Sequence, residues 1–220
     1  MVKPRNKNLI LGGLFAVLYF ALFAFLCFEA LTTGQDSADE SSAVTEVFLK
    51  INAFRSYLYP AEPYAAARKL LGHYSAYALL SVLGSFAFFF LFAENKFVSA
   101  LNIGSGFIVA SATEILQIFA EERGPSFLDV LVNFEGFLSG TLIALTVFTI
   151  IALCRSKDKI GLNDLLIVFG SSAVTLLLVA VLPLSNERAV CFKTFLIVLC
   201  ASTVALFISY VCRKKFKNNA

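Results

Sequence analysis

The sequence is poor in the residues that build metal sites. It has one histidine, and its five cysteines show no CxxC spacing, so a zinc site of the usual Cys/His type is not expected. A lipid-phosphate phosphatase that needs two histidines is excluded for the same reason. The cysteines lie in or at the ends of apolar runs and are interpreted as small packing residues. No cofactor is expected.

Charge is also scarce, because only 15% of the residues are charged. The net charge of +3 is scattered between apolar runs and forms no basic stripe, so a nucleic-acid partner is excluded. By contrast, 59% of the residues are hydrophobic and the mean hydropathy is +0.81. Such a chain is expected to have the lipid bilayer as its solvent, and its long unbroken apolar runs favour helices over a barrel.

Six apolar runs are long enough to cross a bilayer as helices. They predict an all-α membrane bundle with spans at about Leu9–Leu31, Leu71–Phe92, Phe97–Phe119, Val130–Leu153, Leu162–Leu182 and Val190–Cys212. The first run is longer than a signal-peptide core and no clean A-x-A site follows it, so it is expected to remain as an anchor.

Basic residues in the short loops predict the orientation of the bundle. They gather in residues 3–7, at Lys96, in residues 155–159 and in residues 213–217. Because lysine and arginine are enriched in short cytoplasmic loops, both termini are expected to be cytoplasmic.

The long loop, residues 32–70, then lies outside. Within it, apolar residues at helical spacing predict an amphipathic helix: Val44, Val47, Phe48, Ile51, Phe54 and Leu58. This helix lies either in the outer membrane interface or on the tops of the spans; both alternatives are open.

Polar side chains gather at the predicted outer ends of three spans. Polar groups in or near a membrane are costly, so each calls for a partner or a function. Those expected in one layer are His73, Tyr77, Glu114, Gln117, Arg123, Asp129 and Asn133, with Gly136 and Gly140 continuing the last stripe as close-packing positions. Gly104 and Gly106 are also interpreted as packing residues.

The ordered motif E-x-x-Q, Arg, D-x-x-x-N-x-x-G-x-x-x-G, preceded by H-Y-x-x-Y, resembles the signature of VanZ-like membrane proteins. The resemblance covers roughly Leu9 to Leu153, and departs from the family pattern at Ala76, where an acidic residue is common, and at Glu135. It implies a multi-pass protein of the bacterial plasma membrane with a site on the outer face. The family's namesake is associated with resistance to teicoplanin. The resemblance further implies a VanZ-like core, residues 1–153, and an added two-helix hairpin with a basic tail, residues 154–220.

Three interpretations of the polar layer stay open. In the first, Glu114, Arg123 and Asp129 form a charge-assisted network that pins the loop between two spans. In the second, the layer is a binding site in which Arg123 holds an anion and His73 and Tyr77 donate hydrogen bonds. In the third, it is a catalytic site with His73, Glu114 and Asp129 as acid–base groups. As a binding site, the layer would bind a lipid-linked cell-wall intermediate or surface glycopeptide, or alter access to it. As a catalytic site, it would modify a lipid head group. As a purely structural network, it would belong to a structural partner of another envelope protein. Whether the chain is an enzyme is left undecided.

One pair inside the predicted bundle carries a separate hypothesis. Glu135 lies off the polar stripe, and Lys193 is at a similar depth in the sixth span. They are predicted to form an ion pair that docks the last two spans onto the core; the alternative is that Lys193 reaches to the surface.

Overall fold

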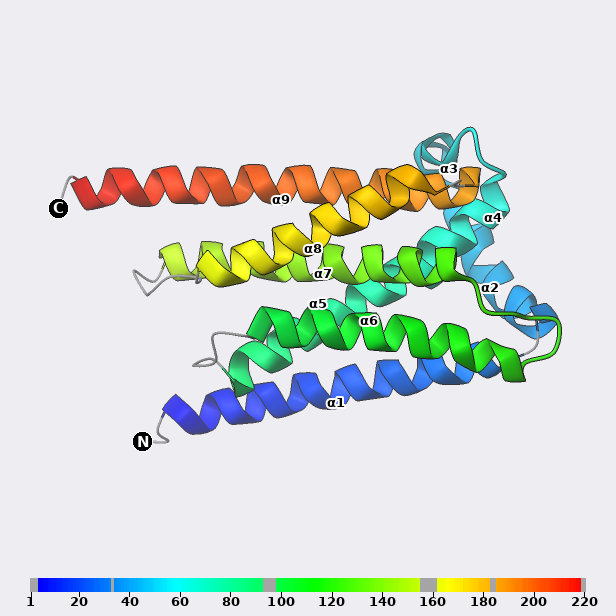
Figure 1. Ribbon diagram of the computed structural model, residues 1–220, viewed down its shortest axis with the longest axis horizontal. Helices are drawn as coiled ribbons and strands as arrows, with labels where there is room; N and C mark the ends of the chain where they lie inside the picture. The colour runs from blue at the N-terminus through cyan, green and yellow to red at the C-terminus, as the bar shows by residue number, and fades with distance from the viewer. Residues whose placement is uncertain (1–3, 33, 93–97, 155–161, 183–184, 219–220) are drawn as a thin grey trace.

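The computed structural model describes residues 4–32, 34–92, 98–154, 162–182 and 185–218, and these contain helices and no strand. Along the chain the helices are α1 (Pro4–Leu31), α2 (Gly34–Leu49), α3 (Asn52–Leu58), α4 (Pro63–Arg68), η1 (Lys69–Ser75), α5 (Ala76–Leu91), α6 (Val98–Leu116), η2 (Gln117–Phe119), α7 (Phe127–Cys154), α8 (Leu162–Val181) and α9 (Asn186–Asn218). The long helices lie side by side along one axis, with the start of α1 and the end of α9 at the same end (Figure 1).

Five helical runs of the described residues are long and apolar enough to cross a membrane. They are Asn8–Leu31, Pro63–Leu91, Ser99–Phe119, Phe127–Ile151 and Asn186–Ser209. The fifth predicted span, Leu162–Leu182, forms α8, whose described apolar run, Phe169–Val179, is shorter. The all-helical membrane fold is therefore confirmed, and the six-span topology stays a prediction. Lys3, Lys96 and residues 155–159, which carry much of the orientation argument, lie outside the described residues.

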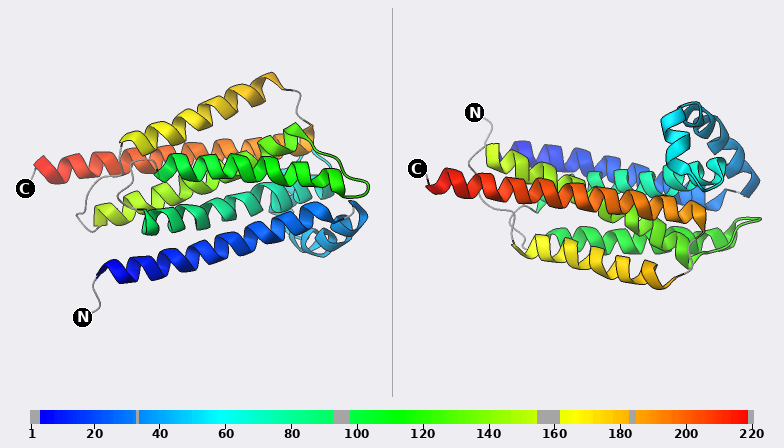
Figure 2. Two further views of the ribbon diagram at one scale, coloured as in Figure 1. Left: turned by 60° about the horizontal axis from the view of Figure 1, so that its bottom comes forward. Right: turned by 90° about the horizontal axis from the view of Figure 1, so that it is seen from above.

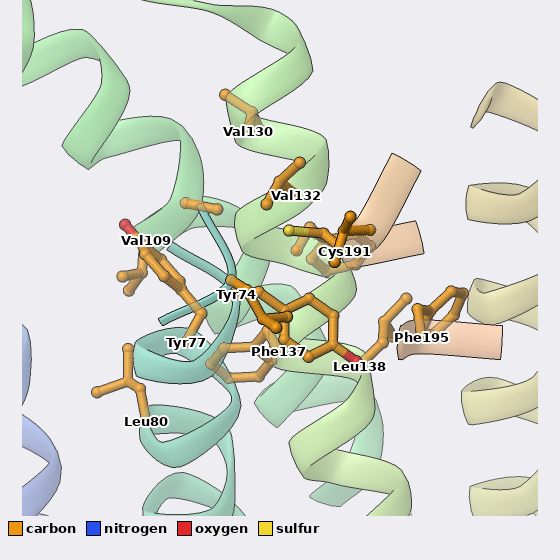
Figure 3. Packing of buried hydrophobic residues seen from close by; sticks show 14 of the residues in the cluster. Tyr74, Tyr77, Leu80, Val109, Val130, Val132, Phe137, Leu138, Cys191 and Phe195 are labelled. Atoms are coloured by element: carbon orange, nitrogen blue, oxygen red, sulfur yellow. The ribbon is translucent and has the colours of Figure 1, made fainter. Parts of the chain in front are cut away.

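Helix α7 is the centre of the bundle. It packs against α5, α6, α8, α9 and η1, and residues 130–142 are all buried. Apolar contact with α9 is close, because the side chains of Phe137, Leu138, Cys191 and Phe195 are each essentially inaccessible. Figure 3 shows how side chains from η1, α5, α6, α7 and α9 meet in this core. The last helix is thus part of the same packed unit.

The backbone of α7 approaches those of η1 and α5 closely because α7 has glycines at the contacts. A Cβ at Gly136 would lie 2.1 Å from the carbonyl oxygen of Tyr74, and one at Gly140 would lie 2.1 Å from that of Ala78. Gly106 of α6 faces the ring of Phe137 in the same way, at 2.3 Å. Gly104 faces open space, with nothing within 4 Å, so its interpretation as a packing residue was wrong. Gly106, two residues further along α6, is the glycine on the packed face.

The predicted ion pair between Glu135 and Lys193 is not formed. The Lys193 ammonium donates to the carbonyl oxygen of Tyr57 at 2.6 Å and lies 3.8 Å from the centre of that tyrosine ring. Glu135 is 2% exposed, and its Oε2 has no hydrogen-bond partner among the described residues. The reason is that α3 lies within reach of α9 and supplies both a carbonyl and an aromatic face, which the sequence pattern did not place there.

The predicted amphipathic helix is two helices, because the chain bends at residues 50–51 between α2 and α3. Leu58 at the end of α3 is fully buried, whereas Val44 and Val47 of α2 are 55% and 61% exposed. The apolar residues are therefore divided between the bundle and the outer surface. Figure 2 shows α2, α3 and α4 at one end of the bundle, away from the end of α9.

Candidate functional site

A cleft of about 750 Å³ lies at the end of the bundle where α2 and α4 are found. Helices α1 and α2 contribute apolar side chains to its lining, including Phe25, Leu26 and Val44. The ionisable and amide side chains that line it are Glu29, Arg68, Lys69, His73, Glu114, Gln117, Arg123, Asn133, Glu187 and Arg188. The cleft thus combines an apolar wall with a dense polar floor, and six of the predicted site residues, Tyr77 included, line it.

Glu114 is the centre of the polar floor. Its Oε1 accepts hydrogen bonds from the side-chain amides of Gln117 at 3.0 Å and Asn133 at 3.3 Å. Its Oε2 accepts from the backbone N–H of Ser126 at 3.2 Å. The side chain is 1% exposed, so these donors replace the water that a carboxylate would otherwise bind. This arrangement ties α6, η2, the loop before α7 and α7 itself together.

His73 joins the same network through Asn133. Its Nδ1 lies 3.1 Å from Oδ1 of Asn133, whose amide nitrogen is the group bonded to Glu114. Tyr77, one turn further along, instead forms a hydrogen bond with the hydroxyl of Thr113, so its predicted role as a ligand donor has a competing partner inside the protein. The result is a continuous chain from Glu114 through Asn133 to the His73 ring.

The segment that carries His73 is a π-helix, η1, rather than an α-helix. Within it, the Ser75 hydroxyl donates to the carbonyl oxygen of Leu70, five residues back. Single π-turns occur frequently at functional sites. Here the π-helix presents Lys69, Leu71, Gly72 and His73 to the cleft, four residues of one short segment.

Asp129, in the first turn of α7, holds two cations. Its Oδ2 lies 2.7 Å from the Lys69 ammonium, and its Oδ1 lies 3.0 Å from Nε of Arg188. Arg188 also donates to the hydroxyl of Ser126 at 3.3 Å. Asp129 therefore links α7 to η1 and α9. Neither cation was predicted as its partner, because the sequence pattern placed Arg123 with Asp129 instead.

Arg123 makes a different contact from those predicted. Its NH1 donates to the carbonyl oxygens of Glu29 at 2.6 Å and Thr32 at 3.5 Å, at the end of α1. The last carbonyls of a helix have no partner within the helix, so a guanidinium is a favourable cap there. The predicted ion pairing of Arg123 with Glu114 and Asp129 is not formed.

Arg68 lines the cleft without a partner among the described residues. It lies at the end of α4 and lines the cleft, and within the described part of the chain no hydrogen bond or ion pair engages its guanidinium. Across those same residues, no three His, Cys, Asp or Glu side chains meet as metal ligands. A guanidinium without a protein partner suits a phosphate or carboxylate group.

Comparison with known families decides the classification. The family model described as VanZ/LLP1 matches residues 15–151, more than half of the chain. The chain belongs to the VanZ/LLP1 family. No curated protein and no solved structure matches it.

The family match confirms the resemblance seen in the sequence. It runs from α1 almost to the end of α7, and so includes every cleft residue named above except those of α9. In this VanZ/LLP1 protein Arg188 reaches the cleft from beyond the matched residues. The segment outside the match thus contributes a charged side chain to the site.

Proposed function

We propose that this VanZ/LLP1 protein binds the polar head group of a membrane-anchored cell-envelope molecule at the outer face of a bacterial plasma membrane. The size of the cleft supports this, because pockets for small ligands span roughly 300–1,000 Å³. Its composition does so as well: Phe25, Leu26 and Val44 offer an apolar wall, and charged side chains line the same cleft. An amphiphilic ligand matches both surfaces.

The observation that carries the proposal is the guanidinium of Arg68, which lines this cleft and has no partner among the described residues. The other arginines of the cleft have protein partners: Arg123 caps α1, and Arg188 pairs with Asp129. A guanidinium presents a planar set of donors that suits phosphate and carboxylate groups. Arg68 is therefore the side chain that an incoming anionic group meets without breaking an existing contact.

In the cell, such binding would alter access of glycopeptide antibiotics to a lipid-linked or surface target. We expect a glycopeptide-susceptible Gram-positive host that makes this protein to bind less fluorescent teicoplanin at its surface. Arg68→Gln is expected to abolish most of that reduction, because a hydrogen bond to a charged group contributes about 1.5–3 kcal/mol, roughly a ten- to hundredfold change in affinity.

Arg55→Gln is the matched control, because Arg55 is an exposed arginine of α3 outside the cleft lining. It should leave teicoplanin binding as in the wild type at equal protein level by blot. Equal effects of the two variants, or unchanged teicoplanin binding with well-expressed wild-type protein, would refute this role.

A further inference from the structure

The hydrogen bonds of the cleft fix which way the Asn133 amide points. The carboxylate of Glu114 is an acceptor, and the backbone N–H of Ser126, which it also contacts, can act only as a donor. The nitrogen of the Asn133 amide therefore faces Glu114, and its oxygen faces Nδ1 of His73. The opposite orientation would place the amide oxygen of Asn133 against the carboxylate oxygen of Glu114, two acceptors with no hydrogen between them.

The orientation of Asn133 in turn fixes the proton on His73. Since Oδ1 of Asn133 is an acceptor, Nδ1 of the ring must carry the hydrogen. A neutral imidazole has a single N–H, so Nε2 then holds a lone pair. The ring lines the cleft, and Nε2 has no hydrogen-bond partner among the described residues. The cleft thus presents a hydrogen-bond acceptor at Nε2 of His73.

Two chemically different groups of the cleft are thereby left for a ligand. Nε2 of His73 can accept a hydrogen bond from a ligand, and the Arg68 guanidinium, on the neighbouring helix, can bind an anionic group. Lys69 and Arg188 add positive charge nearby, although both are engaged by Asp129. A hydroxyl beside a phosphate meets both requirements, whereas a phosphodiester without a free hydroxyl meets only one.

We propose, building on the head-group function above, that the cleft selects a phosphate-bearing head group with a free hydroxyl, which donates to Nε2 of His73 while the phosphate lies against Arg68. The shared chemistry, a hydroxyl close to a phosphate, occurs both in membrane lipids and in soluble phosphate esters. The apolar wall formed by α1 and α2 favours the lipid.

The histidine tautomer is the first test, and it needs no ligand. His73 is the single histidine of the chain, so ¹⁵N-imidazole labelling in lipid nanodiscs yields one pair of ring nitrogen signals. At neutral pH we expect Nδ1 to be protonated and Nε2 to be unprotonated. Asn133→Leu should release the ring from this tautomer. Finding Nε2 protonated in the wild-type protein, in either the neutral or the charged ring, would overturn the inference.

Ligand selectivity is the second test. Short-chain phosphatidylglycerol and phosphatidylmethanol carry the same phosphodiester charge, but only the former has free hydroxyls. We expect the wild-type protein to bind phosphatidylglycerol on the order of tenfold more tightly, since a site built around a hydrogen bond discriminates against the analogue that lacks it. His73→Asn should remove the preference, because its amide can keep the bond to Asn133 while the acceptor at Nε2 is lost.

The outcomes separate the two proposals. Equal binding of both lipids by the wild-type protein would overturn the hydroxyl selectivity and leave head-group binding standing. Failure of both lipids to bind would refute the binding of a phosphate head group altogether. Glycerol phosphate and inorganic phosphate serve as soluble competitors. If glycerol phosphate displaces the lipid at a similar concentration, the source is a soluble ester and the lipid assignment is wrong; inorganic phosphate, which lacks the glycerol hydroxyls, should compete poorly.

Discussion

Gly136→Ala is expected to lower the thermal stability of the protein strongly. A Cβ at this position would lie 2.1 Å from the Tyr74 carbonyl oxygen and 3.0 Å from the Cα of the same residue. These are backbone atoms of η1, so no side-chain rotation relieves the overlap, and η1 must move away from α7. Overpacking of a tight core costs about 1–3 kcal/mol, and this rigid contact should lie at the upper end.

The same change should disturb the site. Tyr74 follows His73 directly, so a displaced η1 lengthens the contact of 3.1 Å between Nδ1 of His73 and Oδ1 of Asn133. Thermal unfolding in detergent measures the loss of stability, and the His73 ¹⁵N signals report the loss of the contact. Gly104→Ala is the matched control, because its Cβ would meet nothing within 4 Å. Equal melting temperatures for the two variants would contradict the close approach of η1 and α7.

Asp129→Ala is expected to be the most damaging change of a single charged residue. It leaves the Lys69 ammonium and the Arg188 guanidinium close together without their shared carboxylate. Removing one partner of a buried ion pair costs about 3–5 kcal/mol, and partial exposure of these side chains reduces the expectation to about 2 kcal/mol. Loosening of α9 from α7 should accompany the loss, because Arg188 is the α9 side of this contact.

Thermal unfolding again provides the measurement, with two comparisons. Glu121→Ala removes an exposed acid from the loop just before α7 and should change stability little. Adding Arg188→Met to Asp129→Ala should recover part of the loss, since one of the two unpaired cations is then gone. A double variant that is less stable than Asp129→Ala would show that Arg188 stabilises the bundle through other contacts.

Much of the candidate site could be predicted from the order of polar residues along the chain. Helical spacing puts Glu114 on the same face as Gln117, and Asp129 on the same face as Asn133, and a short loop brings the two spans together. That reasoning works because neighbouring helices joined by a short loop must have their adjoining ends close in space. The hydrogen bonds from Gln117 and Asn133 to Glu114 are the structural counterpart of this local argument.

Contacts between distant segments could not be predicted in that way. Arg188 reaches Asp129 across 59 residues, and Lys193 reaches Tyr57 across 136. Spacing along one helix says nothing about which other helix packs against it. The pairing of Glu135 with Lys193 was wrong for this reason: similar depth in the membrane is not the same as a shared interface.

The sequence by itself determined that this chain is a bundle of membrane helices and where its polar layer lies, because lipid leaves an apolar run no alternative to internal hydrogen bonding. The tertiary structure decided which side chains of the polar layer pair with one another. Only the packing of η1 on Gly136, of α9 on α7 and of α3 on α9 assigns a partner to each charge. That packing leaves Arg68 and Nε2 of His73 open to the cleft among the described residues, whereas Arg123, Lys69, Arg188 and Asn133 each have a partner in the protein.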